Sequence, residues 1–188
     1  MSIDIVVSRY NEEVEWTTPF SRVFLYNKGE PLSEEYNEIR LPNVGKEGHT
    51  YYTHICENYD TLADHTIFLQ GNPFDHFPHV VEHIQHFMEN HPYHVQFEYI
   101  CNRVYCCNLS GCKFHQNLPL RDVYEHLFGE RKEEMAFTFY RGAQFIISKE
   151  QIRKRPKSFY QKIVNLLNKE INPVEGYVME RFHQFVFK

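Results

Sequence analysis

The chain has 188 residues, 25 of them acidic and 20 Lys or Arg, with a formal net charge of −5 at pH 7. Hydrophobic residues make up 42% of it and aromatic residues 16%, which excludes a disordered chain and predicts one domain, residues 1–188. The acidic balance argues against a nucleic-acid binder, which needs excess base to neutralise phosphates. The N-terminal run contains Asp4 and no basic segment, and no stretch reaches the roughly 20 apolar residues of a membrane span. We therefore expect no signal peptide, no membrane span and no nucleic-acid partner.

Short apolar runs alternate with amphipathic segments along the first half of the chain. Runs rich in β-branched residues are typical of strands buried on both faces, and apolar residues spaced by three or four are typical of helices. The predicted strands lie in IDIVV (3–7), RVFLYNKG (22–29) and HTIFLQG (65–71), and the predicted helices lie within 41–59 and 80–91.

The second half is predicted to hold both kinds of element. VQFEYICNRVYCC (95–107) predicts one or two strands, and MAFTFYRGAQFIIS (135–148) predicts a strand, a close turn at Gly142 and a second strand. Ser148, three residues before Gln151, has the signature of a capping box. Predicted helices cover 122–128, with Asp122 as N-cap, then 159–170 and 178–187.

Strands that alternate with helices predict an α/β fold, in which helices flank a mostly parallel sheet. Ligands of such sheets collect at the carboxyl ends of the strands. Three polar clusters follow predicted strands directly: SRYNEE (8–13), YNKG (26–29) and QGNPFDH (70–76). We expect these clusters to form one ligand-binding edge.

The cluster after the third strand has two interpretations. Mg²⁺ and Mn²⁺ take carboxylate and other oxygen ligands, often beside substrate phosphates, so Asn72, Asp75 and His76 are candidate metal ligands. Asn-Pro-Phe-Asp is equally good turn chemistry, and no repeated acidic motif accompanies it. Both interpretations stay open.

Two other segments suit a phosphorylated ligand. SRYNEE offers Arg9 for a phosphate and Asn11 for a base or ribose edge, although a solvated loop explains it as well. NVGKEGH (43–49) brings glycines and Lys46 to a helix start, where backbone N–H groups can hold a phosphate. It matches neither the Walker nor the Rossmann pattern.

The cysteines and histidines give weaker signals. Cys101, Cys106, Cys107 and Cys112, with His115, are a possible zinc set, but their spacing departs from the usual C-x₂₋₄-C pairs, so buried thiols remain the alternative. The histidines at 76, 79, 83 and 86 have helical spacing, which is more typical of a solvated face than of a metal site.

Six blocks in this order resemble a family of unknown function that is widespread in fungi, and the glycosyltransferase domain of large chlorella viruses. The blocks are VVSRYNEEVEW, VFLYNKG, LPNVGKEGHTYYTHICENYD, TIFLQGNPFDH, FYRGAQFIISKEQIRKRP and MERFHQFVF. The viral domain is similar to the GT-A class of nucleotide-sugar transferases. The resemblance implies a single-domain GT-A-like sandwich in the cytoplasm, of the host cell if the chain is viral.

The resemblance also implies roles for individual residues. The residues implied to bind the nucleotide sugar are Arg9, Tyr10, Asn11, Glu12, Asn43, Gly45, Lys46, Arg141, Gly142 and Gln144. Asp75, with His76 and Asn72, stands where the class binds Mn²⁺ or Mg²⁺, but the usual Asp-X-Asp has become Gly-Asn-Pro-Phe-Asp. Glu180 stands where inverting members carry the catalytic base, and Asp75 is the other candidate.

The function this implies is transfer of a sugar from a nucleotide-diphosphate sugar to a hydroxyl of a glycan or other acceptor, inverting and assisted by a divalent metal. Two alternatives remain: a metal-dependent hydrolase that uses the acidic and histidine residues, and a non-catalytic module that binds a sugar or nucleotide.

Overall fold

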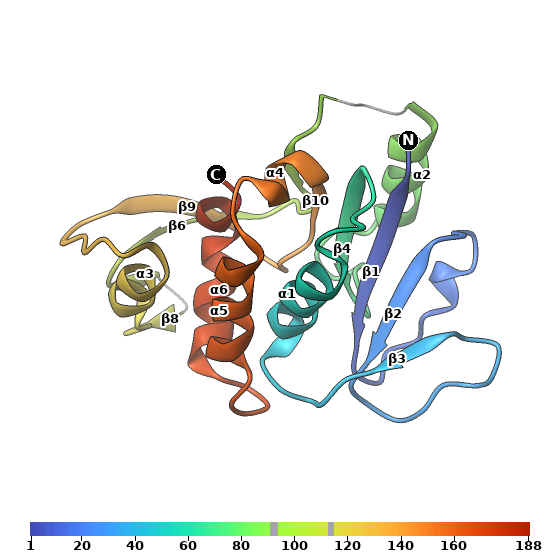
Figure 1. Cartoon of the computed structure of the whole chain (residues 1–188), viewed down its shortest axis with the longest axis horizontal. Coiled ribbons are helices and arrows are strands. Elements are labelled where there is room, and N and C mark those ends of the chain that lie inside the picture. The colour runs from blue at the N-terminus through green and yellow to red at the C-terminus, as the bar shows by residue number, and fades with distance from the viewer. Residues whose placement is uncertain (91–93, 113–114) are drawn as a thin grey trace.

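The computed structural model describes residues 1–90, 94–112 and 115–188. Its centre is a six-stranded sheet in the order β3-β2-β1-β4-β10-β5, in which the first four strands are parallel and β10 runs antiparallel to both neighbours (Figure 1). The strands are β3 (Glu38–Arg40), β2 (Val23–Asn27), β1 (Ile3–Arg9), β4 (His65–Gln70), β10 (Phe145–Ser148) and β5 (Phe97–Tyr99). The predicted α/β class with a mostly parallel sheet is confirmed.

Helices cover both faces of this sheet. On one face pack α1 (Lys46–Asn58), α5 (Lys157–Leu167) and α6 (Val174–Val186), and on the other packs α2 (Val80–Asn90). Neighbouring residues of β1 accordingly enter different cores: Val6 packs with the α1 side, while Ile5 and Val7 pack with the α2 side. The continuous apolar run of β1 is explained by this burial on both faces.

A second, antiparallel sheet lies beyond α6, on the left of Figure 1. Its order is β8-β7-β6-β9, and α3 packs beside it against α5 and α6. The elements are β8 (His115–Gln116), β7 (Gly111–Cys112), β6 (Val104–Asn108), β9 (Ala136–Tyr140) and α3 (Leu120–Phe128). Cys107 and Phe139 of this sheet belong to the same apolar core as Phe68 of the main sheet. Both sheets therefore share one core.

Several sequence predictions need correction. The predicted strand, turn and strand at 135–148 are present, but β9 and β10 belong to different sheets. The turn therefore connects the two sheets, and the two strands do not form a hairpin. Asp122 is not an N-cap, because α3 begins earlier, at the fully buried Leu120, and Asp122 falls in its first turn. Strands β3, β7 and β8 were not predicted, because two or three residues are too few to show the alternation of apolar and polar residues that marks a strand. The predicted capping box is confirmed only as an N-cap: Ser148 Oγ accepts the Gln151 N–H at 3.1 Å and starts α4 (Lys149–Arg153). The reciprocal bond is not made, because the Ser148 N–H donates to Gln96 O and the Gln151 side chain donates to Phe187 O.

The core between the main sheet and α6 is largely aromatic. The ring of Phe145 lies 5.1 Å from that of Phe68, 4.8 Å from His183 and 5.4 Å from Phe187, centroid to centroid. His183 is buried, which lowers its pKa to about 3, and its Nδ1 lies 2.8 Å from the Tyr52 hydroxyl. The neutral imidazole thus serves as one more packed ring.

We expect Phe145→Ala to lower the free energy of unfolding by about 3–5 kcal/mol, because the deleted ring leaves a cavity that its aromatic neighbours cannot fill. Val104→Ala is the control: Val104 is 50% exposed, so its loss should change stability by less than about 0.5 kcal/mol. Denaturant unfolding followed by circular dichroism measures both, and equal effects would contradict this account of the core.

Candidate functional site

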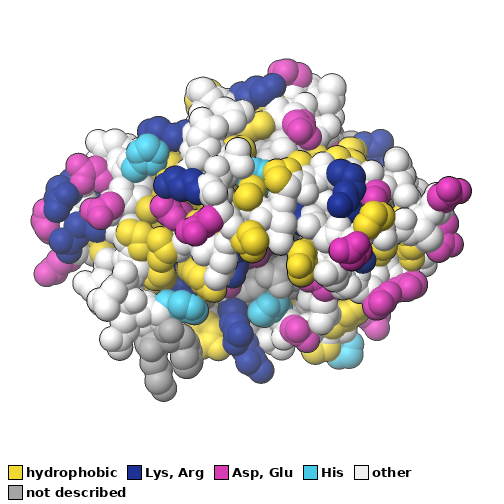
Figure 2. Space-filling view, turned by 90° about the horizontal axis from the view of Figure 1, so that it is seen from below, with side chains coloured by type: hydrophobic (Ala, Val, Ile, Leu, Met, Phe, Trp, Pro, Cys, Tyr) yellow, Lys and Arg dark blue, Asp and Glu magenta, His cyan; other side chains and the backbone are white. Residues whose placement is uncertain are grey.

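Two adjoining cavities open at the edge where β1, β2 and β4 end. The larger, about 640 Å³, contains Lys28 in its wall and is called the Lys28 cavity; the smaller, about 340 Å³, contains Glu180 and is called the Glu180 cavity. Among the described residues, Lys46, Glu47 and Gln70 line both. Figure 2 looks onto this face, where acidic, basic and histidine side chains surround a hollow. The expected ligand edge therefore coincides with a pair of connected cavities.

A strained turn delivers α1 to the junction of the two cavities. Gly45 (φ 64°) and Lys46 (φ 54°) both have left-handed backbone, which is costly for lysine. A Cβ on Gly45 would lie 2.7 Å from Leu167 O, and the Gly45 N–H donates to Glu170 O at 2.9 Å. The turn brings the first residues of α1, Lys46 and Glu47, to the walls of both cavities. Lys46 Nζ lies 4.0 Å from the centre of the Tyr177 ring.

Lys28, just after β2, is a buried cation in the wall of the larger cavity. Its Nζ donates to the carbonyl of Val44 at 2.7 Å and to that of Lys46. Burial lowers the pKa of Lys28 to about 8, although Glu47 opposes the shift. Sequence reasoning placed the YNKG cluster at this edge but did not single out Lys28.

Arg9 lines the Lys28 cavity, but its guanidinium is already engaged by the protein. Nε donates to Glu12 O at 2.9 Å, and Nη1 donates to Asn27 Oδ1 and Glu30 O, both at 2.8 Å. A Cβ on Gly29 would lie 1.5 Å from Tyr10 O, so the loops after β1 and β2 are in close contact. Arg9 thus ties these two loops together and shapes the cavity from behind.

The residues after Arg9 have different surroundings. Tyr10 is half exposed at the rim of the Lys28 cavity. Glu12 also lines it, with Oε2 accepting the Tyr10 N–H at 2.6 Å. Asn11 lines neither cavity, and its Oδ1 accepts the Glu30 N–H at 2.9 Å. Asn43 lines the Lys28 cavity, as the sequence led us to expect.

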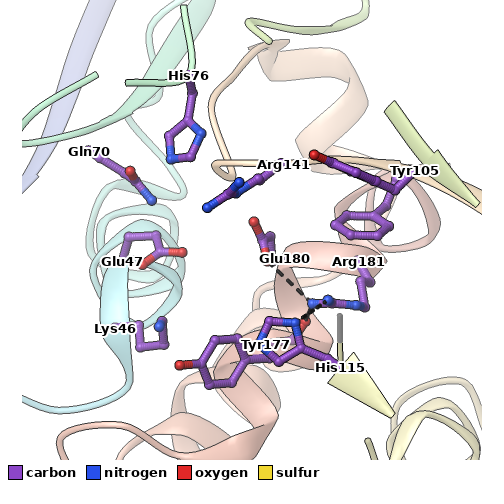
Figure 3. A pocket seen from close by; sticks show the side chains of 11 residues that line it. Lys46, Glu47, Gln70, His76, Tyr105, His115, Arg141, Tyr177, Glu180 and Arg181 are labelled. Carbon is purple, nitrogen blue, oxygen red and sulfur yellow. Dashed lines mark hydrogen bonds and ion pairs between the residues drawn. The ribbon is translucent and has the colours of Figure 1, made fainter. Parts of the chain in front are cut away.

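Two carboxyl groups point into the Glu180 cavity from opposite helices. Glu180 of α6 is held at both oxygens: Oε1 accepts the Gly142 N–H at 2.8 Å, and Oε2 lies 3.3 Å from Arg181 Nη1. Glu47 of α1 faces it across the cavity (Figure 3). Burial and the nearby charge of Glu180 raise the pKa of Glu47. A pair of carboxyls in such different surroundings is a frequent mark of acid–base chemistry.

Arg181 supports Glu180 from within the protein. It is fully buried, with Nη1 donating to Tyr177 O at 2.6 Å, Nη2 3.1 Å from His115 Nδ1, and the guanidinium 4.4 Å from the centre of the Phe139 ring. Nη2 also donates to Cys112 Sγ at 3.4 Å. This network joins α6 to the small sheet and fixes the carboxylate.

The turn before β10 closes the same cavity. Because β10 runs antiparallel to β4, the turn reaches the edge where β4 ends. Arg141 is exposed and points into the space between Glu47 and Glu180 (Figure 3). A Cβ on Gly142 (φ 101°) would lie 2.4 Å from His76 Cγ. Gln144 is buried away from both cavities, with Nε2 donating to the Pro73 carbonyl at 3.3 Å. It positions the loop that carries His76.

The expected metal ligands lie on this loop but do not all face one cavity. Asn72 and the exposed Asp75 line the Lys28 cavity, while His76 lines the Glu180 cavity. Asn72 Oδ1 accepts the Phe74 N–H at 3.3 Å, as in an ordinary Asx turn, and Trp16 Nε1 donates to Gly71 O at 2.9 Å. Within residues 1–90, 94–112 and 115–188, no three His, Cys, Asp or Glu side chains are grouped to hold a metal. These donors therefore do not fit a metal site built by the protein.

The same holds for zinc. Cys107 and Cys112 are buried side by side next to Arg181, and burial raises the pKa of Cys107 to about 11. Cys106 is exposed, and the described cysteines and histidines form no group of three. In the described part of the chain, no helix is long and apolar enough to cross a bilayer.

A comparison with protein-family models matches residues 5–188, almost the whole chain, to one family, described as a protein of unknown function. The chain belongs to the DUF3431 family. No curated protein and no solved structure matches it. The resemblance to a family of unknown function is therefore confirmed, and these comparisons link the DUF3431 chain to no glycosyltransferase.

Most residues singled out from the sequence surround the two cavities, but important neighbours were missed. In this DUF3431 chain they are Lys28, Glu47, Gln70, Tyr177 and Arg181. Glu47 directly follows Lys46 and Arg181 directly follows Glu180, so the only available signal was that they adjoin residues already singled out. His115 was singled out for zinc and not for this cavity, and nothing local marked Tyr177, which reaches the site through tertiary packing.

Gly142→Ala should destabilise the protein more than the roughly 1–2 kcal/mol expected for alanine in left-handed backbone, because its Cβ would collide with His76. Gly129→Ala is the matched control: Gly129 has φ 71°, and no described heavy atom lies within 4 Å of the added Cβ. Denaturant unfolding compares the two variants, and equal losses of stability would refute the close contact between the turn and His76.

Proposed function

We propose that the chain is a glycosyltransferase that uses a nucleotide-diphosphate sugar and a hydroxyl acceptor. One observation carries the proposal: a cavity with cationic groups and a helix N-terminus adjoins a cavity with two carboxyls, and both share Lys46, Glu47 and Gln70. A donor of this kind needs a site for the diphosphate directly beside a site for the reacting sugar. The resemblance of the ordered sequence blocks to a viral glycosyltransferase domain supports the same class.

The diphosphate fits the Lys28 cavity on chemical grounds. Lys28 and Lys46 supply positive charge, and the first N–H groups of α1 supply donors at the positive end of the helix dipole. Tyr10 at the rim offers a ring on which a base can stack. Arg9 also lines this cavity and adds positive charge, while its Nε and Nη1 bind carbonyls of the two loops and hold the guanidinium in place.

The sugar and the acceptor fit the Glu180 cavity. Tyr105, Phe139 and Tyr177 provide apolar ring surface, while Arg141, His76 and Gln70 provide polar groups for hydroxyls. Pockets for small polar ligands commonly combine a few such polar groups with aromatic walls.

The proposed reaction is direct displacement at the anomeric carbon. Glu180, held by Gly142 and Arg181, takes the proton of the acceptor hydroxyl as its oxygen attacks. The bond from the anomeric carbon to the phosphate oxygen breaks, and Lys28 and Lys46 stabilise the charge that develops on the leaving diphosphate. A single inversion follows. The donor set around Asp75 does not fit a protein-built metal site, so the proposal routes no step through Mn²⁺ or Mg²⁺.

The rival functions draw less support. A metal-dependent hydrolase needs a converging acidic and histidine cluster, and a zinc-stabilised binding module needs grouped thiols; the described residues provide neither. Paired carboxyls in a cavity favour a reaction over simple binding.

A thermal-shift screen tests donor binding. Nucleoside diphosphates and their sugar conjugates, each with a chelator or with Mn²⁺, should raise the melting temperature by mass action. Lys28→Met should weaken binding about 10- to 100-fold, which corresponds to the loss of a charged hydrogen bond of about 1.5–3 kcal/mol. Lys162→Met is the control, because Lys162 is exposed on α5 and lines neither cavity. If no member of the panel shifts the wild-type protein, the proposal fails.

Affinity for the diphosphate should fall as the pH rises through about 8. The pKa of Lys28 is lowered to about 8, so its charge is lost at a lower pH than that of an ordinary lysine. A bound anion favours the charged form, and binding therefore takes up a proton above this pH. Calorimetric titration between pH 6.5 and 9.5 measures the effect. Lys28→Met should show a flatter profile, and identical profiles would exclude Lys28 from the anion site.

Glu180→Gln should abolish sugar transfer while leaving diphosphate binding intact, because the amide keeps the shape but cannot accept the proton. Asp75→Asn is the matched comparison: it removes the other candidate base, which lies in the Lys28 cavity. Transfer by Glu180→Gln at the wild-type rate, or loss of transfer only in Asp75→Asn, would assign the base to Asp75.

A further inference from the structure

Glu47 occupies the junction of the two cavities. It lines both of them, together with Lys46 and Gln70, and of these three it alone can donate or accept a proton at mild pH. The bond that breaks in the proposed reaction joins the sugar to the diphosphate, so it must lie at this junction. On the proposed function, we infer that Glu47 is a second catalytic group, which donates a proton to the departing diphosphate while Glu180 accepts the proton of the acceptor.

Glu47 is held in place by a turn with strained, left-handed backbone. Glu47 is the second residue of α1 and follows the left-handed pair Gly45 and Lys46. A Cβ on Gly176 of α6 would lie 2.8 Å from the Lys46 side chain, so the start of α1 is packed closely against α6. In Figure 3 the Glu47 carboxyl points across the cavity toward Glu180. Strain of this kind persists where the surrounding structure fixes the geometry.

The two carboxyls have different neighbours. Glu180 Oε1 accepts the Gly142 N–H at 2.8 Å, and its Oε2 lies 3.3 Å from Arg181 Nη1. Burial and the charge of Glu180 favour the protonated form of Glu47, whereas Lys46, Lys28 and its own backbone N–H oppose it, and the pKa is raised on balance. Two tyrosines lie close enough to Glu47 to be affected by its charge: Tyr51, one turn further along α1, and Tyr177 of α6. Different environments thus separate an acid from a base.

The step balances without any further reactant. The acceptor oxygen forms a bond to the anomeric carbon and its proton goes to Glu180. The bond from that carbon to the phosphate oxygen breaks, its electron pair stays on the phosphate, and the phosphate takes the proton of Glu47. The enzyme then carries its proton on Glu180, and transfer of that proton to Glu47 restores the starting state. Double use of two carboxyls in this way parallels inverting glycoside hydrolysis.

A titration tests the coupling of the carboxyls without reference to catalysis. Carbon-13 NMR of protein labelled at the glutamate carboxyls follows Glu47, assigned through Glu47→Gln. Glu180→Gln should move the Glu47 titration to lower pH, because it removes the negative charge that favours the protonated form. Asp60→Asn is the control and should leave it unchanged, because Asp60 is exposed and lines neither cavity. An unchanged titration in Glu180→Gln would overturn the inference.

Kinetics test the role in transfer, using the nucleotide sugar for which the wild-type protein shows turnover in a panel of UDP and GDP sugars. Glu47→Gln should reduce kcat at least 100-fold. In the wild-type protein kcat should fall at high pH, because the catalytic acid loses its proton, and this fall (the alkaline limb of the pH profile) should be absent in Glu47→Gln. Its diphosphate affinity should stay the same, because glutamine keeps the shape and neutrality of the protonated carboxyl. Glu47→Asp should recover part of kcat with that limb restored.

The two proposals fail in different ways. If the wild-type protein turns over no sugar of the panel, the proposed function fails and the titration still reports on the carboxyl pair. If the wild-type protein is active and Glu47→Gln keeps its kcat and pH profile, the assignment of Glu47 fails alone. If Glu47→Gln loses kcat but its kcat still falls at high pH as in the wild-type protein, Glu47 is not the proton donor and has only a structural role.

Discussion

Strands β1 and β4 are covered on both faces, since α1 and α6 pack on one side and α2 on the other. A strand in this position tolerates few polar residues unless they are paired, as Asp4 is with Arg22, so most polar residues stand in the loops that follow the strands. Because β1, β2 and β4 are parallel, their polar loops emerge at one edge. Strand β10 runs the other way and brings the turn around Gly142 to the same edge. The concentration of charged groups there follows from the burial of the strands.

The cations at this edge are stabilised mainly by groups that carry no full charge. Arg9 binds backbone carbonyls and the amide of Asn27, and Lys28 binds the carbonyls of Val44 and Lys46. Carbonyl oxygens satisfy buried N–H donors without cancelling the charge. Arg181 differs, since Glu180 neutralises it, and it acts as a support for that carboxylate.

The sequence allowed the architecture and the location of the site to be predicted, because both depend on local signals. Apolar runs that end in Arg9, Lys28 and Gln70 mark strand ends, and the alternation with helices indicates a parallel sheet. The direction of β10 was not predictable, since it depends on which sheet each half of 135–148 joins. Likewise, the sequence suggested Gln144 as a ligand group, whereas tertiary packing buries it. The contacts by which Arg9 ties two loops together were also beyond local sequence signals. Glu47 gained significance only once Glu180 was seen opposite it.

Trp16 is the single tryptophan of the chain. Its indole N–H binds Gly71 O, and its ring meets that of Phe74 edge-on at 6.2 Å. Both contacts belong to the loop that carries Asp75 and His76 toward the two cavities. The tryptophan fluorescence of the protein consequently arises beside this loop, and its emission provides an optical signal for loop displacement that needs no added dye.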